Sequence, residues 1–167
     1  LVGGSGNDFM LGGKGNDTLR GDSGSNTING GDGNDQIIIA VDNAGDYVLG
    51  GAGDDTFLIT AGRPTARLGL DNYFGDAGRD TFNFNLDSRG TGGTGTTGLY
   101  VNDFSLTEDR ISISLTSDTG TLLDRSAITQ VYETYSHLVL KLESGGATYE
   151  IKFAGLDLAD FDKMVFV

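Results

Sequence analysis

The sequence predicts an all-β solenoid, a fold in which short strands from successive repeats stack into sheets. A nine-residue pattern, Gly-Gly-x-Gly-x-Asp followed by a segment with one large apolar residue, recurs from Gly3 onward. Glycine is abundant, with 28 of 167 residues, which suits closely spaced tight turns. One such unit has too few apolar side chains to fold alone, whereas stacked units can bury a continuous column of them.

The composition is strongly acidic. Asp and Glu together number 24 against 11 Lys and Arg, and the formal net charge is −13. Only four of the acidic residues are Glu, and none of these precedes Glu108. Such a chain is a poor partner for nucleic acid, because phosphate binding needs clustered Lys and Arg, and it favours cations instead. The absence of Cys excludes disulfides, so a metal is the expected source of additional stability.

The repeats keep one register over residues 3–83. Clear units begin at Gly3, Gly12, Gly21, Gly30, Gly50 and Gly75. Two imperfect units fit the same register at 41–49, with Asp46 at position six, and at 66–74, with Asp71 at position six. This leaves two extra residues near Ile39 and seven within 59–65, where Pro64 is tolerated in a loop.

Position eight of each unit carries the large apolar residue. These residues are Met10, Leu19, Ile28, Ile37, Val48, Phe57, Tyr73 and Phe82. A single inward side chain with outward neighbours is the period-two pattern of a short strand, so we expect this column to form the core.

The second half of the chain has no nine-residue register, and we expect an antiparallel β cap there. Residues 90–98 have the composition of a flexible loop. Alternating or β-rich runs predict strands at 99–104, 110–115, 128–135, 138–143 and 148–153, with a hairpin turn at 144–146. A helical turn is expected within 156–162 and a short terminal strand at 164–167. The predicted division is a repeat domain at 1–83 and a cap at 84–167, joined as one structural unit.

The residues expected to bind a ligand lie in the turns of the repeats. A glycine pair permits positive φ and a tight turn, and the Asp at position six adds a carboxylate beside the turn carbonyls. Such hard oxygen ligands, about six or more per ion, suit Ca²⁺ better than Mg²⁺. One turn supplies about half a coordination sphere, so a similar turn from the next coil must complete it.

With these residues, 3–83 resembles the repeats-in-toxin (RTX) family, the calcium-binding β-rolls of bacterial proteins exported by type I secretion. The resemblance implies a right-handed parallel β-roll with two units per coil and several calcium ions between the turns of units n and n+2. It also implies a secreted, extracellular protein that uses the type I secretion machinery.

Two units per coil divide the turns between two edges of the roll. The first edge, expected to hold three strong sites, comprises Gly12, Gly13, Gly15, Asp17, Gly30, Gly31, Gly33, Asp35, Gly50, Gly51, Gly53, Asp55, Gly75, Gly78 and Asp80. The second edge, expected to bind weakly, comprises Gly3, Gly4, Gly6, Asp8, Gly21, Gly24, Asn26, Asp46 and Asp71. It is weaker because Asn26 is uncharged and the units of Asp46 and Asp71 lack the glycine pair.

The second half adds two resemblances. The segment from Val101 to Ile111 is similar to the one that follows the repeats in the serralysin proteases. That similarity implies a further calcium ion shared by Asp103 and Asp109, which are six residues apart. Residues 160–167 resemble the acidic-then-apolar terminus of type I secretion substrates, although a terminal strand that finishes the cap explains them equally well.

Several residues that could belong to a functional site can also be explained by a structural role. The position-six Asp residues could be turn formers in a metal-free solenoid, but stacked unpaired carboxylates are costly. His137, the single histidine, fits a strand position, and no supporting motif indicates a Ser-His-Asp site around it. Paired carboxylates for glycoside hydrolysis occur in any acidic protein, and Tyr132, Tyr135 and Tyr149 fit cap packing better than a sugar-stacking face. The turns lack the Lys-Ser/Thr of phosphate loops.

The leading interpretation is a non-catalytic module that folds on extracellular calcium and supports secretion and folding of a larger protein. Two alternatives remain open, namely an adhesin segment and a module that binds an anionic, alginate-like polysaccharide. A basic strip for such a polymer would have to come from Arg63, Arg67, Arg79, Arg89 and Arg110. No signal peptide or long apolar run indicates membrane insertion. Leu1 and Val2 fit positions eight and nine of a preceding unit, so we expect the chain to be a fragment.

Overall fold

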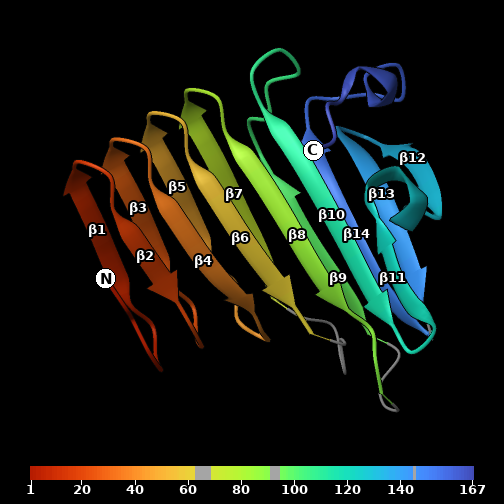
Figure 1. Cartoon of the computed structure of the whole chain (residues 1–167), viewed down its shortest axis with the longest axis horizontal. Helices are drawn as coiled ribbons and strands as arrows, with labels where there is room; N and C mark the ends of the chain where they lie inside the picture. Colours follow the sequence, from red (N-terminus) through yellow and green to blue (C-terminus); the bar gives the residue numbers. More distant parts are fainter. Residues whose placement is uncertain (63–68, 91–94, 145) are drawn as a thin grey trace.

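The computed structural model describes residues 1–62, 69–90, 95–144 and 146–167. Two sheets face each other, and the chain passes back and forth between them (Figure 1). The eight-stranded sheet contains, in spatial order, β1 (Phe9–Lys14), β3 (Thr27–Asp32), β5 (Tyr47–Ala52), β7 (Leu70–Ala77), β9 (Thr96–Val101), β14 (Ala147–Ala154), β13 (His137–Ser144) and β12 (Gln130–Thr134). The six-stranded sheet contains β11 (Gly120–Leu123), β10 (Arg110–Ser117), β8 (Thr81–Asp87), β6 (Thr56–Ala61), β4 (Gln36–Val41) and β2 (Thr18–Gly21).

Strands from alternate units pair in parallel, as a β-roll with two units per coil requires. In the eight-stranded sheet Met10 pairs with Ile28, and Val48 with Tyr73. In the six-stranded sheet Ile37 pairs with Phe57. The pairing at Val48 and Tyr73 confirms the register expected for the described parts of the two imperfect units; residues 66–68, in the second of them, lie outside the described residues.

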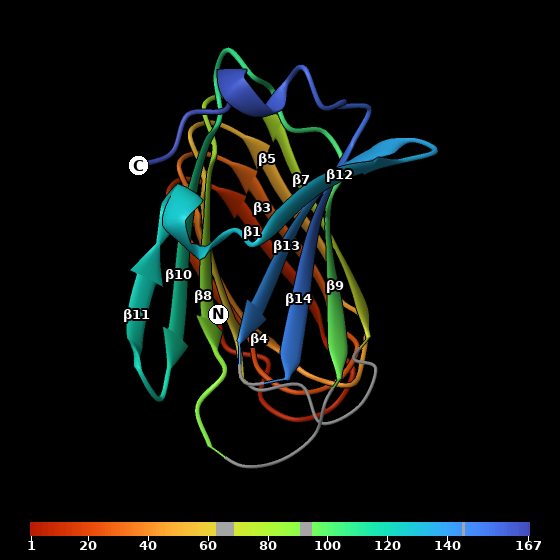
Figure 2. The same cartoon turned by 90° about the vertical axis from the view of Figure 1, so that its right-hand side faces the viewer.

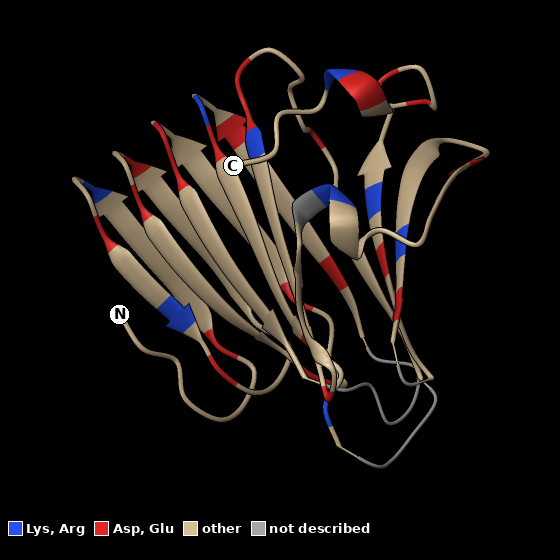
Figure 3. Cartoon of the chain, turned by 45° about the vertical axis from the view of Figure 1, so that its right-hand side comes forward, with Lys and Arg blue, Asp and Glu red and all other residues tan. Residues whose placement is uncertain are grey.

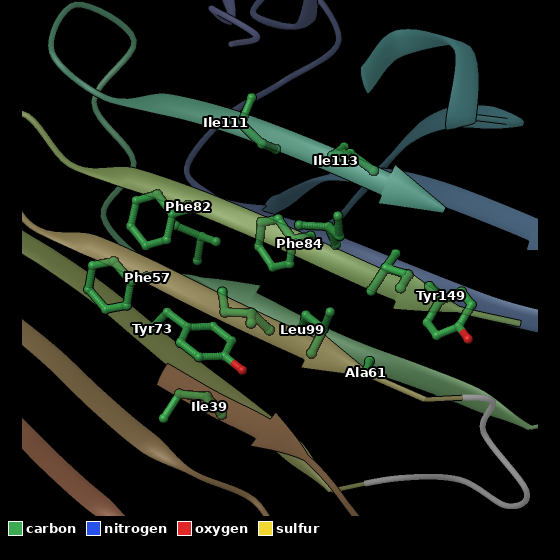
Figure 4. Close-up of a cluster of buried hydrophobic side chains, with 14 of the residues drawn as sticks. Ile39, Phe57, Ala61, Tyr73, Phe82, Phe84, Leu99, Ile111, Ile113 and Tyr149 are labelled. Carbon is green, nitrogen blue, oxygen red and sulfur yellow. The ribbon is translucent and has the colours of Figure 1, made fainter. Parts of the chain in front are cut away.

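The position-eight column is the core, as predicted. Met10 is 6% exposed and the other seven members are fully buried. Phe57 stacks on Phe82 with ring centroids 4.7 Å apart and meets Tyr73 edge-on at 6.3 Å (Figure 4).

The core widens along the chain. Strand β1 buries only Met10, whereas β8 buries Phe82, Phe84 and Leu86. One apolar cluster extends from Met10 to Met164, so the cap and the roll share a core. The division into domains at residue 83 stays a prediction.

The parallel coils continue past residue 83 before the antiparallel part begins. Strand β9 pairs in parallel with β7 and with β14, and β10 pairs in parallel with β8. Only then do antiparallel pairs follow, formed by β10–β11, β13–β14 and β12–β13 (Figure 2).

Five predicted strands correspond to β9, β10, β12, β13 and β14, but several details of the second half were wrong. The expected loop at 90–98 is shorter, because residues 96–98 already belong to β9 and pair through their backbone without needing large side chains. Residues 91–94 of that loop and Gly145 of the predicted hairpin turn lie outside the described residues. The terminal strand is reduced to one bridge between Phe166 and Ile111.

Among the described residues, the helical elements are two short 3-10 turns, Asp124–Ala127 and Phe161–Lys163. The second falls at the end of the expected helical turn. Over the part of the chain that the structure describes, neither the length nor the hydropathy of any helix would let it cross a membrane.

Candidate metal centre

The turns of the roll form two edges. The first edge lies where β1, β3, β5 and β7 turn into the even-numbered strands, and it contains Asp17, Asp35, Asp55 and Asp80. The second edge lies where even-numbered strands return, and it contains Asp8, Asn26, Asp46 and Asp71. Acidic residues gather at the strand ends (Figure 3).

The position-six side chains form a hydrogen-bonded ladder between coils. On the first edge the backbone N–H of Asp17 donates to Oδ1 of Asp35 at 2.8 Å, and that of Asp35 donates to Oδ1 of Asp55 at 2.8 Å. Asp55 donates to Oδ1 of Asp80 and Asp80 to Oδ1 of Asp109, both at 2.9 Å. The four steps link residues 18, 20, 25 and 29 positions apart in the chain. Position six is therefore fixed by its neighbouring coil whatever the length of the intervening loop.

The second oxygens of these carboxylates are unsatisfied. Oδ2 of Asp8, Asp17, Asp35, Asp46 and Asp55 is buried without a hydrogen-bond partner within the described structure. A buried carboxylate oxygen without a partner is costly, so these five oxygens suit a positively charged ligand. This observation favours a bound cation over a metal-free solenoid.

The first glycine of each first-edge unit provides the space beside that oxygen. A Cβ on Gly30 would lie 2.2 Å from Oδ2 of Asp35 and 2.5 Å from the carbonyl oxygen of Gly50. A Cβ on Gly12 would lie 2.9 Å from Oδ2 of Asp17 and 2.3 Å from the Gly30 carbonyl oxygen.

The same arrangement recurs one coil further. A Cβ on Gly50 would lie 2.4 Å from Oδ2 of Asp55 and 2.7 Å from the Gly75 carbonyl oxygen. A carboxylate oxygen of one coil and a carbonyl oxygen of the next thus converge at three successive points. Such oxygens are the ligands that calcium prefers.

The second glycine of the pair allows the coils to approach. Gly31 has φ +109°, and a Cβ there would lie 2.1 Å from the carbonyl oxygen of Gly13. In the last repeat this position is Asp76, the one described non-glycine residue with positive φ, at 65°. The turn geometry is therefore retained there at the cost of backbone strain.

A second ladder, at position five, was missed in the sequence. Oδ1 of Asn16 accepts the backbone N–H of Asn34, and Oδ1 of Asn34 accepts that of Asp54, both at 2.9 Å. Oδ1 of Asp54 in turn accepts the N–H of Arg79. The recurrence of Asn before the position-six Asp was the available signal. The two ladders run in opposite directions, so each coil both gives and receives hydrogen bonds at its turn.

The second edge differs in ways that follow from its substitutions. A Cβ on Gly21 would meet Cδ1 of Ile28 at 2.7 Å and the Asn26 amide nitrogen at 3.3 Å, but no oxygen is among its nearest atoms. Oδ2 of Asp71 accepts a hydrogen bond from the Tyr73 hydroxyl at 3.2 Å. The position-six ladder nevertheless continues, with the N–H of Asp46 donating to Oδ1 of Asp71 at 2.9 Å.

Asp103 and Asp109 lie on the first edge but have their oxygens occupied by backbone. Asp103 accepts the N–H of Gly75 at 2.9 Å and that of Asp76 at 2.8 Å, through different oxygens. Asp109 accepts the N–H of Asp80 through Oδ1 and that of Ser105 through Oδ2. These two residues close the last repeat coil with hydrogen bonds. Whether they share a calcium ion stays a prediction.

Burial raises the carboxyl pKa of two position-six residues on each edge. On the first edge it raises the pKa of Asp55 to about 6 and that of Asp80 to about 7, with neighbouring carboxylates adding to the effect. On the second edge it raises the pKa of Asp46 to about 6 and that of Asp71 to about 7. Without a cation, the roll therefore favours protonated carboxyls at a pH where free Asp is ionised.

The calcium-free chain is accordingly expected to gain stability on acidification. The folded-state pKa values exceed the ordinary 3.8, so the stabilisation is complete below pH 3.8 and is lost as pH rises through 6 to 7. Circular dichroism of chelator-treated, dialysed protein should show more β structure at pH 5 than at pH 8. With saturating calcium this trend should disappear or reverse, because protons compete with the ion. An equal or smaller β signal at pH 5 without calcium would contradict the assignment of these carboxyls.

The carboxylates are distributed rather than clustered. In the described ranges, no group of three or more His, Asp or Glu side chains is placed to hold one metal ion. Any cation at the first edge must therefore be held largely by backbone carbonyls, with one or two carboxylates per ion.

The other candidate residues have structural roles. His137 Nδ1 lies 2.9 Å from the Ser136 hydroxyl, and its ring packs edge-on against Tyr100. Tyr149 is buried, and its hydroxyl donates to the Asp87 carbonyl at 2.8 Å. Tyr132 donates to Glu150 at 2.7 Å, whereas Tyr135 is fully exposed.

The repeats match a known family. The RTX calcium-binding nonapeptide repeat matches residues 2–37 and 42–62, in four copies. The matched residues are RTX-type calcium-binding nonapeptide repeats. The RTX match supports calcium as the cation for the unsatisfied oxygens, and it agrees with the parallel coils described above. No curated protein matches the chain.

Among solved structures, the chain is similar to the AlgE6R3 subunit of the mannuronan C5-epimerase of Azotobacter vinelandii, which was determined in solution. The identity is 25%, the TM-score is 0.29, and the match covers 93% of this chain and 80% of that one. The RTX roll itself is established here by its strand pairing.

Proposed function

We propose that this chain is a non-catalytic module of a secreted bacterial protein, and that it folds when it encounters extracellular calcium. The observation that carries the proposal is the row of buried, unsatisfied Oδ2 atoms, each at the first edge lying beside a glycine carbonyl of the next coil. Such a site is incomplete in any single repeat, so ion binding and coil stacking depend on each other.

Three ions occupy the first edge in this proposal. They lie between Asp17 and Asp35, between Asp35 and Asp55, and between Asp55 and Asp80. The glycine carbonyls of the same turns complete each site. The second edge binds more weakly, because Asn26 lacks a charge and Oδ2 of Asp71 is engaged by Tyr73.

Calcium supplies the charge that folding requires. The chain carries a formal charge of −13, and stacked carboxylates repel each other without a cation. Sites with Kd values of about 10⁻⁴–10⁻³ M, typical of extracellular modules, stay empty at cytosolic calcium and fill outside the cell. An unfolded chain suits passage through the type I secretion machinery, and the acidic-then-apolar residues 160–167 support that route.

An anionic, alginate-like polysaccharide is less favoured as the partner. Arg79 and Arg110 flank the first edge, whereas Arg89 follows β8 at the opposite end and pairs with Asp87 at 2.6 Å. Arg63 and Arg67 lie outside the described residues. Of the five arginines considered for a basic strip, the three that the structure describes therefore do not align into one.

Replacing Asp35 should remove more calcium than replacing Asp8. Asp35 lies between two first-edge sites, so the Asp35→Ala variant is expected to lose about two ions, while Asp8→Ala loses at most one. Isothermal titration with calcium gives the stoichiometry of each variant. Circular dichroism at saturating calcium should accompany each titration, to establish that the roll still folds. Equal stoichiometries for the two folded variants would refute the assignment of strong and weak edges.

A further inference from the structure

One row of outward side chains crosses six neighbouring strands of the eight-stranded sheet. Strand pairing places its members directly beside one another on β1, β3, β5, β7, β9 and β14. In order, they are Phe9, Thr27, Tyr47, Asn72, Tyr100 and Lys152. Aromatic and hydrogen-bonding residues alternate along the whole row.

The aromatic members of this row are not core residues. Phe9 is 77% exposed and Tyr47 is 45% exposed, on the face opposite the buried column. Tyr47 is supported by Phe74, with ring centroids 5.1 Å apart. Neighbouring strands lie about 4.8 Å apart, so successive aromatic rings recur about every 10 Å along the roll axis. The strands that carry the row lie side by side in Figure 1.

A hollow lies at the end of the row, beside Tyr100. It has a volume of about 290 Å³ and is lined by Leu70, Thr96, Gly98, Glu150 and Lys152. A Cβ on the lining residue Gly98 would come within 3.3 Å of Leu70 and 3.4 Å of the Tyr100 ring. The glycine therefore leaves space next to an aromatic ring.

The polar groups at the hollow are linked and balanced in charge. Lys152 Nζ lies 3.2 Å from Glu150 Oε2 and donates to the Tyr100 hydroxyl at 3.2 Å. Glu150 Oε1 accepts the Tyr132 hydroxyl at 2.7 Å. Lys152 is the one cationic residue of the row, and it is paired with Glu150. The row therefore offers hydrogen bonds without net charge, in a chain that is strongly acidic overall.

We propose that this row binds an uncharged, linear β-linked polysaccharide along the long axis of the roll. The apolar faces of sugar rings stack on the exposed rings of Phe9 and Tyr47, and their hydroxyl groups bond to Thr27, Asn72 and Lys152. In an extended β-linked chain, alternate sugars present the same face, which matches the alternation of the row. The hollow beside Tyr100 takes one sugar ring. This inference goes beyond the calcium function and requires only the folded roll.

Binding can be tested by titrating the calcium-saturated protein with cellohexaose and mannohexaose as neutral probes, and with a mannuronate hexamer as the anionic one. A neutral hexasaccharide should bind and shift the amide resonances of residues 9, 27, 47, 72 and 100. The resonances of Leu58 and Asn83, on the outer face of the other sheet, should not move. Tyr47→Ala should weaken binding about tenfold or more, because it removes a central stacking ring.

Tyr135→Ala is the matched control, since this tyrosine is fully exposed but lies outside the row. Its affinity should equal that of the unaltered protein. Binding of neither neutral probe to the folded roll would overturn the proposal, as would stronger binding of the anionic hexamer or an equal loss in both variants. Calcium titrations followed by circular dichroism would be unchanged in each of these cases, so the proposed calcium function would be judged separately.

Discussion

Removal of calcium is expected to abolish most of the β structure of the repeat region. The five unsatisfied Oδ2 atoms and the net charge of −13 oppose stacking, and the first coils bury too little apolar surface to offset them. Circular dichroism in excess chelator should show a mainly disordered spectrum, and addition of calcium in excess of the chelator should restore the β signal.

Magnesium at the same concentration is the control and should restore little, because it prefers strict octahedral geometry and retains its waters. A spectrum that chelator leaves unchanged would refute the coupling of folding to calcium. Hydrogen exchange would add spatial detail. Loss of protection should begin at β1 and β2, whose buried apolar residues are Met10 and Leu19, and reach β8 last among the repeat strands.

The Gly30→Ala substitution is expected to be strongly destabilising, because it places a methyl group in the oxygen-lined space of the first edge. The added Cβ would lie 2.2 Å from Oδ2 of Asp35 and 2.5 Å from the backbone carbonyl oxygen of Gly50. The carbonyl cannot move without shifting the next coil, so the substitution combines overpacking with damage to a calcium site. A loss of about 3 kcal/mol in the free energy of unfolding is expected at saturating calcium, together with one or two fewer bound ions.

Gly62→Ala provides the matched control, because a Cβ at that position would meet nothing within 4 Å. Denaturant unfolding of both variants at several calcium concentrations would measure the difference. If Gly30→Ala were as stable as Gly62→Ala and bound as much calcium, the oxygen-lined space beside Gly30 would not be the ion site.

The fold of the repeat half could be predicted well because its sequence repeats every nine residues. Once the nine-residue register was set, Val48 and Tyr73 had to face inward and Asp35 had to lie between Asp17 and Asp55. The hydrogen bonds between coils were harder to predict from the sequence. The partner of Asn16 is Asn34, 18 residues away, and nothing within one repeat reveals which of the two is the donor.

The second half has no repeating pattern, so its sequence does not reveal which strands pair. The backbone pairing of residues 96–98 was hidden by their loop-like composition. The bonds from Gly75 and Asp76 to Asp103 span the boundary between periodic and non-periodic sequence. The row that includes Tyr47 and Tyr100 follows from cross-strand register, which single-strand patterns do not contain.

The unequal ladder steps of 18, 20, 25 and 29 residues have a consequence for how such a protein can be modified. The first-edge turns keep Gly and Asp five residues apart at 12–17, 30–35, 50–55 and 75–80, and within the repeats the added length falls on the opposite side. The roll thus has one rim where the spacing of the turns is constant and one rim where their length varies. Foreign loops grafted between β4 and β5, or between β6 and β7, would enlarge the circumference of a coil while leaving the three strong sites of the first edge untouched.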